Sequence, residues 1–115
     1  MAVNIMEKAD GKEPMKSKFL YMVKDGGEIG QAYFDFYKLT DQKTALDPKT
    51  YQFVYLAYLA ADGIVEGIQR HVMEAKEAGA TREEIQSVIL TGLPVSGAKL
   101  QDVYVAAMET YDSLK

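Results

Sequence analysis

Apolar residues recur at spacings of three and four along most of the chain, which is the pattern of amphipathic helices. A short helix is predicted around residues 19–23, a break at the Asp-Gly-Gly of residues 25–27, and a second helix over residues 28–39. No stretch shows the strict alternation of polar and apolar residues that is typical of strands. The pattern therefore predicts an all-α protein.

The middle of the chain has a clear helix start at Asp47-Pro48. Asp can accept the free N–H groups of a first turn, and Pro suits the first helical position because it has no N–H to leave unpaired. This helix is expected to run to about residue 61 and is apolar nearly all round, which is typical of a core or interface helix. Asp62 is the predicted cap of a further helix over residues 63–79.

Thr81 and Glu84 form a T-x-x-E capping box, in which each residue satisfies a backbone N–H of the other. The helix that follows is expected to break near residues 92–94. A last helix is predicted over residues 98–114, where apolar residues again recur at helical spacing.

The length of 115 residues is that of one domain. Residues 1–14 are polar and are expected to form a flexible N-terminal arm, and residues 15–115 are predicted to form a single domain of about six helices around a helical-bundle core. A domain of this size buries only about two thirds of its unfolded surface. Apolar surface is therefore expected to remain for a partner.

Charge and composition exclude several functions. The net charge is −4, from 17 acidic and 13 basic residues, and no dense Lys/Arg block is present, so nucleic acid is not an expected partner. No apolar run approaches the ~20 residues that span a membrane, and residues 1–14 lack a signal-peptide core, so a cytoplasmic protein is expected. The absence of cysteine excludes disulfides and thiol redox chemistry.

A family resemblance is carried by LDPKTYQFVYLAYLAADGIVEGIQRHVMEAKEAGATREEIQSVI, residues 46–89, and more weakly by TGLPVSGAKLQDVYVAAMETYD, residues 91–112. These stretches closely resemble the carboxymuconolactone decarboxylase family, which includes the alkylhydroperoxidase D-like proteins. The resemblance implies an alkylhydroperoxidase D-like (AhpD-like) helical fold and a homo-oligomer, a trimer or a hexamer.

The resemblance also locates candidate site residues. Thiol-active members carry C-x-x-C-x-x-x-H and a relay glutamate on the preceding helix. In this chain His71 falls on the family histidine, Ile64 and Gly67 occupy the cysteine positions, and Gln52 stands in place of the glutamate. Three of the four groups are absent, so the resemblance implies no working thiol peroxidase.

The decarboxylases of the family also lack the cysteine pair and act without a metal or organic cofactor on a lactone carboxylic acid. By this resemblance His71 is a candidate general acid or base, since imidazole titrates near neutral pH. Its alternative is a core or interface histidine that is hydrogen-bonded to a backbone carbonyl. Glu66 is the acidic candidate near it, and its alternative is a solvated pair with Arg70, four residues on.

Candidate substrate-binding residues are Gln52, Tyr55, Ile64 and Gly67. Gln52 and Tyr55 are three residues apart and can face one cavity together with His71. For Tyr55 the alternative is a packing stripe of tyrosines. Gly67, placed within a predicted helix, allows a helix or a ligand to approach closely.

Two functions follow. The first is a cofactor-free, decarboxylase- or lyase-like enzyme that binds or transforms a small organic acid or lactone by His-assisted proton transfer. The second is a non-catalytic oligomeric binding or structural protein with the same fold. No metal is expected in either, because a single histidine does not make a ligand cluster.

Overall fold

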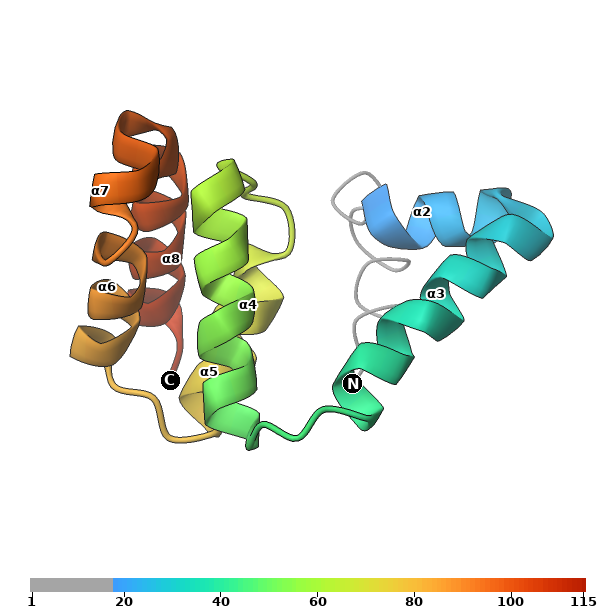
Figure 1. Cartoon of the computed structure of the whole chain (residues 1–115), viewed down its shortest axis with the longest axis horizontal. Helices are drawn as coiled ribbons and strands as arrows, with labels where there is room; N and C mark the ends of the chain where they lie inside the picture. The colour runs from blue at the N-terminus through green and yellow to red at the C-terminus, as the bar shows by residue number, and fades with distance from the viewer. Residues whose placement is uncertain (1–17) are drawn as a thin grey trace. The chain divides into compact units, whose positions relative to one another are not determined.

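The computed structural model describes residues 18–115, in which every regular element is a helix (Figure 1). The predicted all-α fold is confirmed. The chain divides into two compact units, one ending at Thr44 and one spanning Ala45–Lys115, and each is described by itself. The predicted arm, residues 1–14, lies outside the described residues, and the single domain over residues 15–115 stays a prediction.

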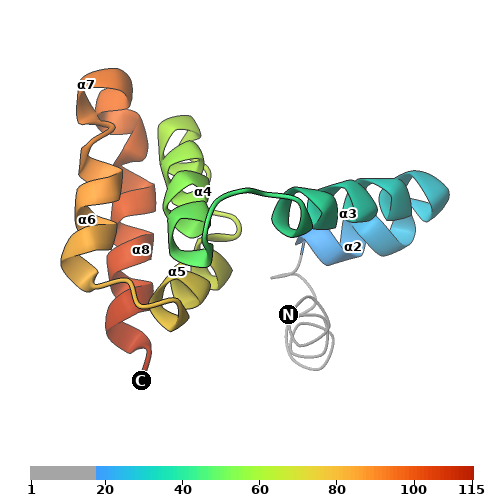
Figure 2. The same cartoon turned by 60° about the horizontal axis from the view of Figure 1, so that its bottom comes forward.

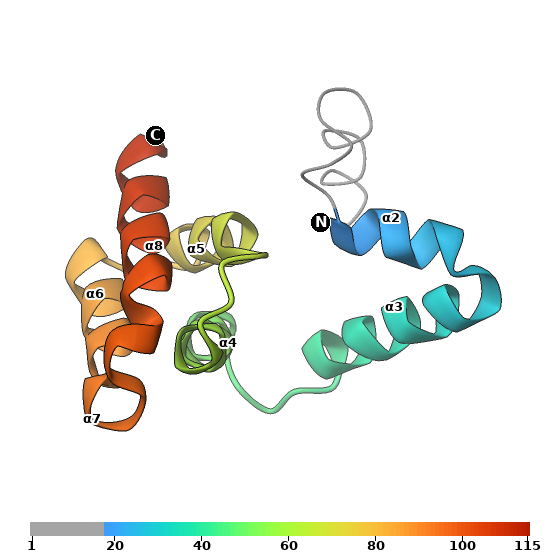
Figure 3. The same ribbon diagram turned by 90° about the horizontal axis from the view of Figure 1, so that it is seen from above.

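The first unit contains helices α2 (Lys18–Asp25) and α3 (Gly27–Gln42), close to the predicted ranges. The chain reverses between them, as Figure 3 shows. Gly30 allows this hairpin to close, because a Cβ at that position would fall inside the van der Waals distance of the Val23 carbonyl oxygen. A glycine is therefore required where α3 passes α2.

Few side chains of this hairpin are buried. Leu20 and Val23 of α2 are enclosed, and the Phe19 ring lies 5.3 Å from that of Tyr37 between centroids. Large apolar side chains remain exposed on both helices: Tyr21, Met22, Ile29, Tyr33, Phe36 and Leu39. Two helices alone cannot enclose a core, which explains this exposure.

The second unit contains α4 (Pro48–Asp62), α5 (Ile68–Glu77), α6 (Arg82–Leu90), the single turn α7 (Leu93–Ser96), the 3₁₀ helix η2 (Gly97–Leu100) and α8 (Gln101–Ser113). Helices α4, α6 and α8 lie side by side, and α5 packs against α4 and α8 (Figures 1 and 2). Their facing sides form one core cluster: Leu56, Ala60, Ile68, Val72, Ala75, Ala80, Ile85, Ile89, Leu100, Val103, Ala107 and Met108.

The predicted helix starts at residues 48 and 82 are confirmed. The Asp47 side chain makes no capping hydrogen bond, so Pro48 at the first position is the feature that marks the start of α4. At α6 the capping box is complete, because the Glu84 amide donates to Thr81 Oγ1 and the Thr81 amide donates to Glu84 Oε1, both at 3.0 Å. Lys49 Nζ also lies 3.1 Å from Glu84 Oε2, which ties α4 to α6.

The predicted helix over residues 63–79 is wrong at its start. Helix α4 continues through Asp62, which therefore does not cap the next helix, and α5 begins only at Ile68. Gly63 and Gly67 have φ of +70° and +87°, in the left-handed region that favours glycine and ends helices. Residues 63–67 form a loop because a glycine interrupts the backbone at each end.

The predicted last helix also begins later than expected. A break near residues 92–94 was predicted, and the chain there makes the single turn α7 and the 3₁₀ helix before α8 begins at Gln101. Among residues 18–115, none of these helices combines the length and the apolar character that crossing a membrane demands.

Candidate functional site around His71

His71 lies in the first turns of α5 with only 4% of its surface exposed, and its ring faces α4. Its Nδ1 is 2.7 Å from Oε1 of Gln52, which is also buried. The Tyr55 ring stacks on the imidazole with centroids 3.7 Å apart and planes 17° from parallel. The structure thus brings His71, Gln52 and Tyr55 together, and the partner of the histidine is a side chain, not backbone.

Two further side chains of α5 extend this contact. Gln52 Nε2 donates to Glu74 Oε1 at 2.9 Å. Arg70 Nε donates to Glu74 Oε2, also at 2.9 Å, and the two side chains are 18% and 14% exposed. His71, Gln52, Glu74 and Arg70 therefore form one continuous chain of hydrogen bonds, here called the His71 network.

The two ring nitrogens of His71 differ in their surroundings. The hydrogen bond to Gln52 uses Nδ1. Among residues 18–115, every fully enclosed side-chain nitrogen or oxygen has a hydrogen-bond partner. Since Nε2 makes no hydrogen bond within that part of the chain, it is not fully enclosed and retains contact with solvent.

The pKa of His71 is lowered from 6.5 to about 3, chiefly by burial and in addition by the positive charge of Arg70. Both effects disfavour the imidazolium form, because a buried charge loses hydration and a neighbouring cation repels it. The ring is therefore neutral at physiological pH, with one nitrogen that donates and one that accepts.

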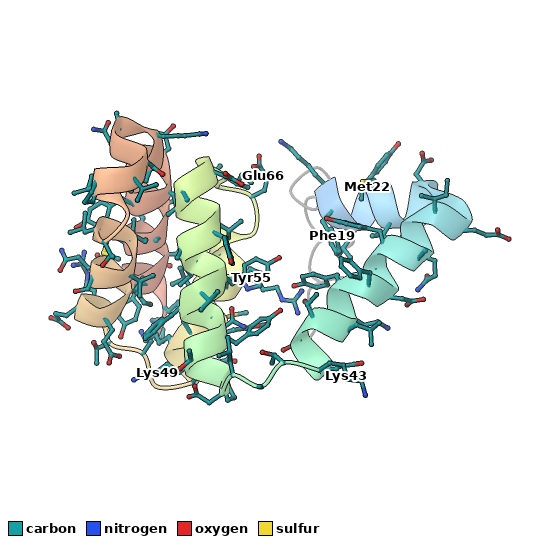
Figure 4. All side chains as sticks on the ribbon, viewed as in Figure 1. Phe19, Met22, Lys43, Lys49, Tyr55 and Glu66 are labelled. Carbon is teal, nitrogen blue, oxygen red and sulfur yellow. The ribbon has the colours of Figure 1, made fainter. Side chains whose placement is uncertain are left out.

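The loop before α5 adjoins the ring. A Cβ on Gly67 would lie 3.7 Å from His71 Cδ2, the ring carbon bonded to Nε2. Ile64 and Glu66 are exposed in the same loop, and Figure 4 shows Glu66 near the far end of α4 and Tyr55 near its middle. Gly67, one of the loop residues predicted for the site, therefore adjoins the imidazole.

Two sequence-based interpretations change. Gly67 is not within a helix but precedes one, and its positive φ explains the glycine. Glu66 lies in the loop before α5, so its spacing to Arg70 is not a spacing within one helix. Arg70 makes an ion pair with Glu74.

Sequence reasoning did not single out Glu74 as a site residue. The signal was present, since Glu74 lies three residues after His71 and four after Arg70, on the same helical face as both.

A comparison with known protein families identifies the family of this chain. A family model described as carboxymuconolactone decarboxylase family matches residues 27–109. The chain therefore belongs to the carboxymuconolactone decarboxylase family, as the resemblance predicted, and it is a member without cysteine. No curated protein and no solved structure was found to match it.

Proposed function

We propose that this protein binds or transforms a small organic acid or lactone, and that His71 moves a proton at Nε2. The observation that supports the proposal is the His71 network, in which Nδ1 is held by Gln52 while Nε2 retains contact with solvent. A base must present a lone pair to its ligand, and the fixed hydrogen bond on the other nitrogen orients the ring for this.

Gln52 restricts the path that the proton can take. A side-chain amide has no carboxylate to take a proton, so Gln52 can hold Nδ1–H but cannot relay a proton onward. A proton taken at Nε2 must therefore leave by Nε2, and the ligand that gives it up or a solvent molecule receives it. A carboxylate on the ligand would raise the pKa of His71 towards neutrality, because an opposite charge stabilises the imidazolium.

The remaining predicted site residues have proposed places around the ring. Tyr55 covers one face of the imidazole, and Gly67 lies beside its Cδ2 edge. Ile64 supplies apolar surface in the loop, and Glu66 is the proposed second catalytic residue beside His71. In this proposal the loop 63–67 contacts the ligand and α4 and α5 position the base.

The proposal is tested with a panel of lactone carboxylic acids, in which decarboxylation and exchange of ligand hydrogen with deuterium are followed by NMR. His71→Gln is expected to abolish turnover, with its fold verified by circular dichroism. Gln69→Ala, an exposed position on the same helix, is the matched control and is expected to keep activity. Equal turnover by His71→Gln and the parent chain would contradict the proposal.

A non-catalytic binding or structural protein is the second candidate. The observation that favours it is the burial of His71 together with a pKa of about 3, since a base works best when its pKa lies near the working pH. This candidate predicts that no member of the panel perturbs the His71 ring resonances, while the His71→Gln chain keeps its fold.

We also propose a homo-oligomer, a trimer or a hexamer. Exposed apolar side chains on α2 and α3 and family membership support it, since apolar surface of this kind is typical of interfaces. Light scattering at micromolar concentration is expected to give a mass of three or six chains. A monomeric mass would contradict it.

A further inference from the structure

We propose that Glu74 is a positioning residue that sets the tautomer of His71, acting through the side-chain amide of Gln52. The inference rests on the proposed function and deepens it at the same site, because the tautomer decides which ligand atoms can form a hydrogen bond with the imidazole. The Glu74 carboxylate is hydrogen-bonded to Gln52 and Arg70, so its effect on the imidazole passes through the Gln52 amide.

The hydrogen-bond directions in the network are fixed by Arg70, which can act only as a donor. The Arg70 guanidinium can only donate, and its Nε donates to Glu74 Oε2. The ionised Glu74 carboxylate can only accept, so its other oxygen must face a donor. That donor is Gln52 Nε2, 2.9 Å away.

The orientation of the Gln52 amide follows. With its NH₂ group directed at Glu74, its carbonyl oxygen is directed at His71 Nδ1, 2.7 Å away. A carbonyl oxygen only accepts, so Nδ1 must carry the hydrogen. A flipped amide would place a carbonyl against a carboxylate, and the other His71 tautomer would place a lone pair against a carbonyl.

Burial makes these alternatives costly. His71 and Gln52 are both enclosed, so little water is available to separate two facing acceptors. A buried polar group that is left without its hydrogen bond destabilises the folded chain, because it has lost its contact with water and gained nothing in return. The Nδ1–H tautomer is therefore strongly favoured in the folded chain, and Nε2 carries the lone pair.

The lone pair on Nε2 defines the ligand class. At neutral pH this nitrogen can only accept, so it fits a ligand that presents a hydroxyl group or an acidic C–H. An ionised carboxylate directed at Nε2 would place one acceptor against another, with no hydrogen between them. The carboxylate of an organic acid is therefore expected to lie elsewhere in the site, with a proton-bearing atom at Nε2.

The test uses the fact that the chain has one histidine, so its ring nitrogens give one unambiguous set of ¹⁵N NMR signals. At pH 7 the parent chain is expected to show a protonated Nδ1 and an unprotonated Nε2. In Glu74→Gln, Arg70 is expected to donate to the side-chain carbonyl oxygen of the new glutamine. The NH₂ group of that glutamine then faces Gln52, and the Gln52 amide flips so that its carbonyl oxygen accepts from it. The hydrogen is then expected on Nε2, so Nε2 gives the signal of a protonated nitrogen and Nδ1 that of an unprotonated one.

A rescue variant and a control complete the test. The double variant Gln52→Glu with Glu74→Gln exchanges the amide and the carboxylate, which restores an acceptor beside Nδ1 and is expected to restore Nδ1–H. Glu77→Gln removes the same charge from an exposed site on α5 and is expected to leave the tautomer unchanged.

Each outcome decides the inference. A parent chain with hydrogen on Nε2 overturns it without any variant, which keeps the test valid even if Glu74→Gln does not fold. A folded Glu74→Gln that retains Nδ1–H, or a double variant that does not regain it, overturns it as well. No ligand is involved, so a failed turnover assay with the expected tautomer exchange would refute the proposed function alone.

Discussion

The two units of this chain differ in what their helices enclose. The second unit encloses a cluster of twelve buried apolar residues. The hairpin α2–α3 buries the side chains of Leu20 and Val23 and leaves six large apolar side chains exposed. Burial of apolar surface is the main favourable term in folding. The second unit is therefore expected to hold most of the stability of the chain.

The same difference explains where the candidate site lies. A neutral imidazole and an amide can be held in one orientation only where surrounding helices are rigid. The His71 network lies between α4 and α5, which contact each other extensively and contribute to the core cluster. The hairpin offers exposed apolar surface, which suits association, and the second unit offers a fixed polar cluster, which suits chemistry.

The largest expected effect is a core truncation. Leu56→Ala in α4 removes a fully buried side chain and is expected to lower the free energy of unfolding by about 3–4 kcal/mol. Leu20→Ala in α2 is expected to lower the free energy of unfolding by only about 2 kcal/mol, because the few side chains around it can move into the space that it leaves. Urea unfolding followed by circular dichroism compares the two, and equal losses would remove the contrast between the units.

A pH effect comes next and belongs to the second unit alone. Between pH 6.5 and pH 3 the unfolded chain binds a proton at His71 that the folded chain does not, because the folded pKa is about 3. Stability is therefore full above pH 6.5 and falls as pH falls, by roughly 2–3 kcal/mol down to pH 4.5. Urea unfolding from pH 7 to pH 4.5 measures this slope, and His71→Gln is expected to abolish it.

Retention of the slope in His71→Gln would assign it to another group. Glu84 and Asp112 also have lowered pKa values, from hydrogen bonds with the Thr81 backbone and with Arg82 respectively. Their contribution is lost only at lower pH, where carboxylates protonate. The window above pH 4.5 therefore isolates the histidine.

Helix capping gives a smaller contrast. Helix α6 has a full capping box, whereas α3 has Gly26 as its N-cap residue and no side-chain capping hydrogen bond. Thr81→Ala is expected to lower the free energy of unfolding by about 1 kcal/mol, since it leaves a first-turn amide without its acceptor. Thr81→Ser, which keeps the hydroxyl, is the control, and an equal loss in both variants would show that the hydroxyl is not responsible.

The smallest effect is expected on the exposed face of the hairpin. Ile29 is 83% exposed, so Ile29→Ala is expected to change the free energy of unfolding of the monomeric chain by no more than about 0.5 kcal/mol. The measurement is made at the lowest usable protein concentration. A loss above 1 kcal/mol there would show that Ile29 is covered within the chain.

Much of the fold was predictable because helical signals are local. The spacing of apolar residues, Asp47-Pro48 and the Thr81–Glu84 box each predicted a helix or its start within a few residues. The loop over residues 63–67 was not predicted, because its apolar spacing is compatible with a helix. What ends α4 is the left-handed conformation of Gly63, and a glycine by itself does not reveal its φ.

The site was predictable in part for a similar reason. Gln52, Tyr55 and His71 follow from helical spacing and from the family resemblance. Glu74 was missed because a charged residue in a polar segment is usually solvated, and only the packing of α4 against α5 brings the Gln52 amide to its carboxylate. Contacts between helices depend on their packing, which residue spacing within one helix does not specify.

The central claim is that His71 is a buried, neutral side chain held between α4 and α5. Its most direct test is an NMR titration of the single histidine, in which the ring Hδ2 and Hε1 shifts are followed from pH 8 to pH 4. The structure predicts no titration step between pH 8 and pH 5, because the pKa lies at about 3. A midpoint near pH 6.5 would show a solvated imidazole and would contradict the claim.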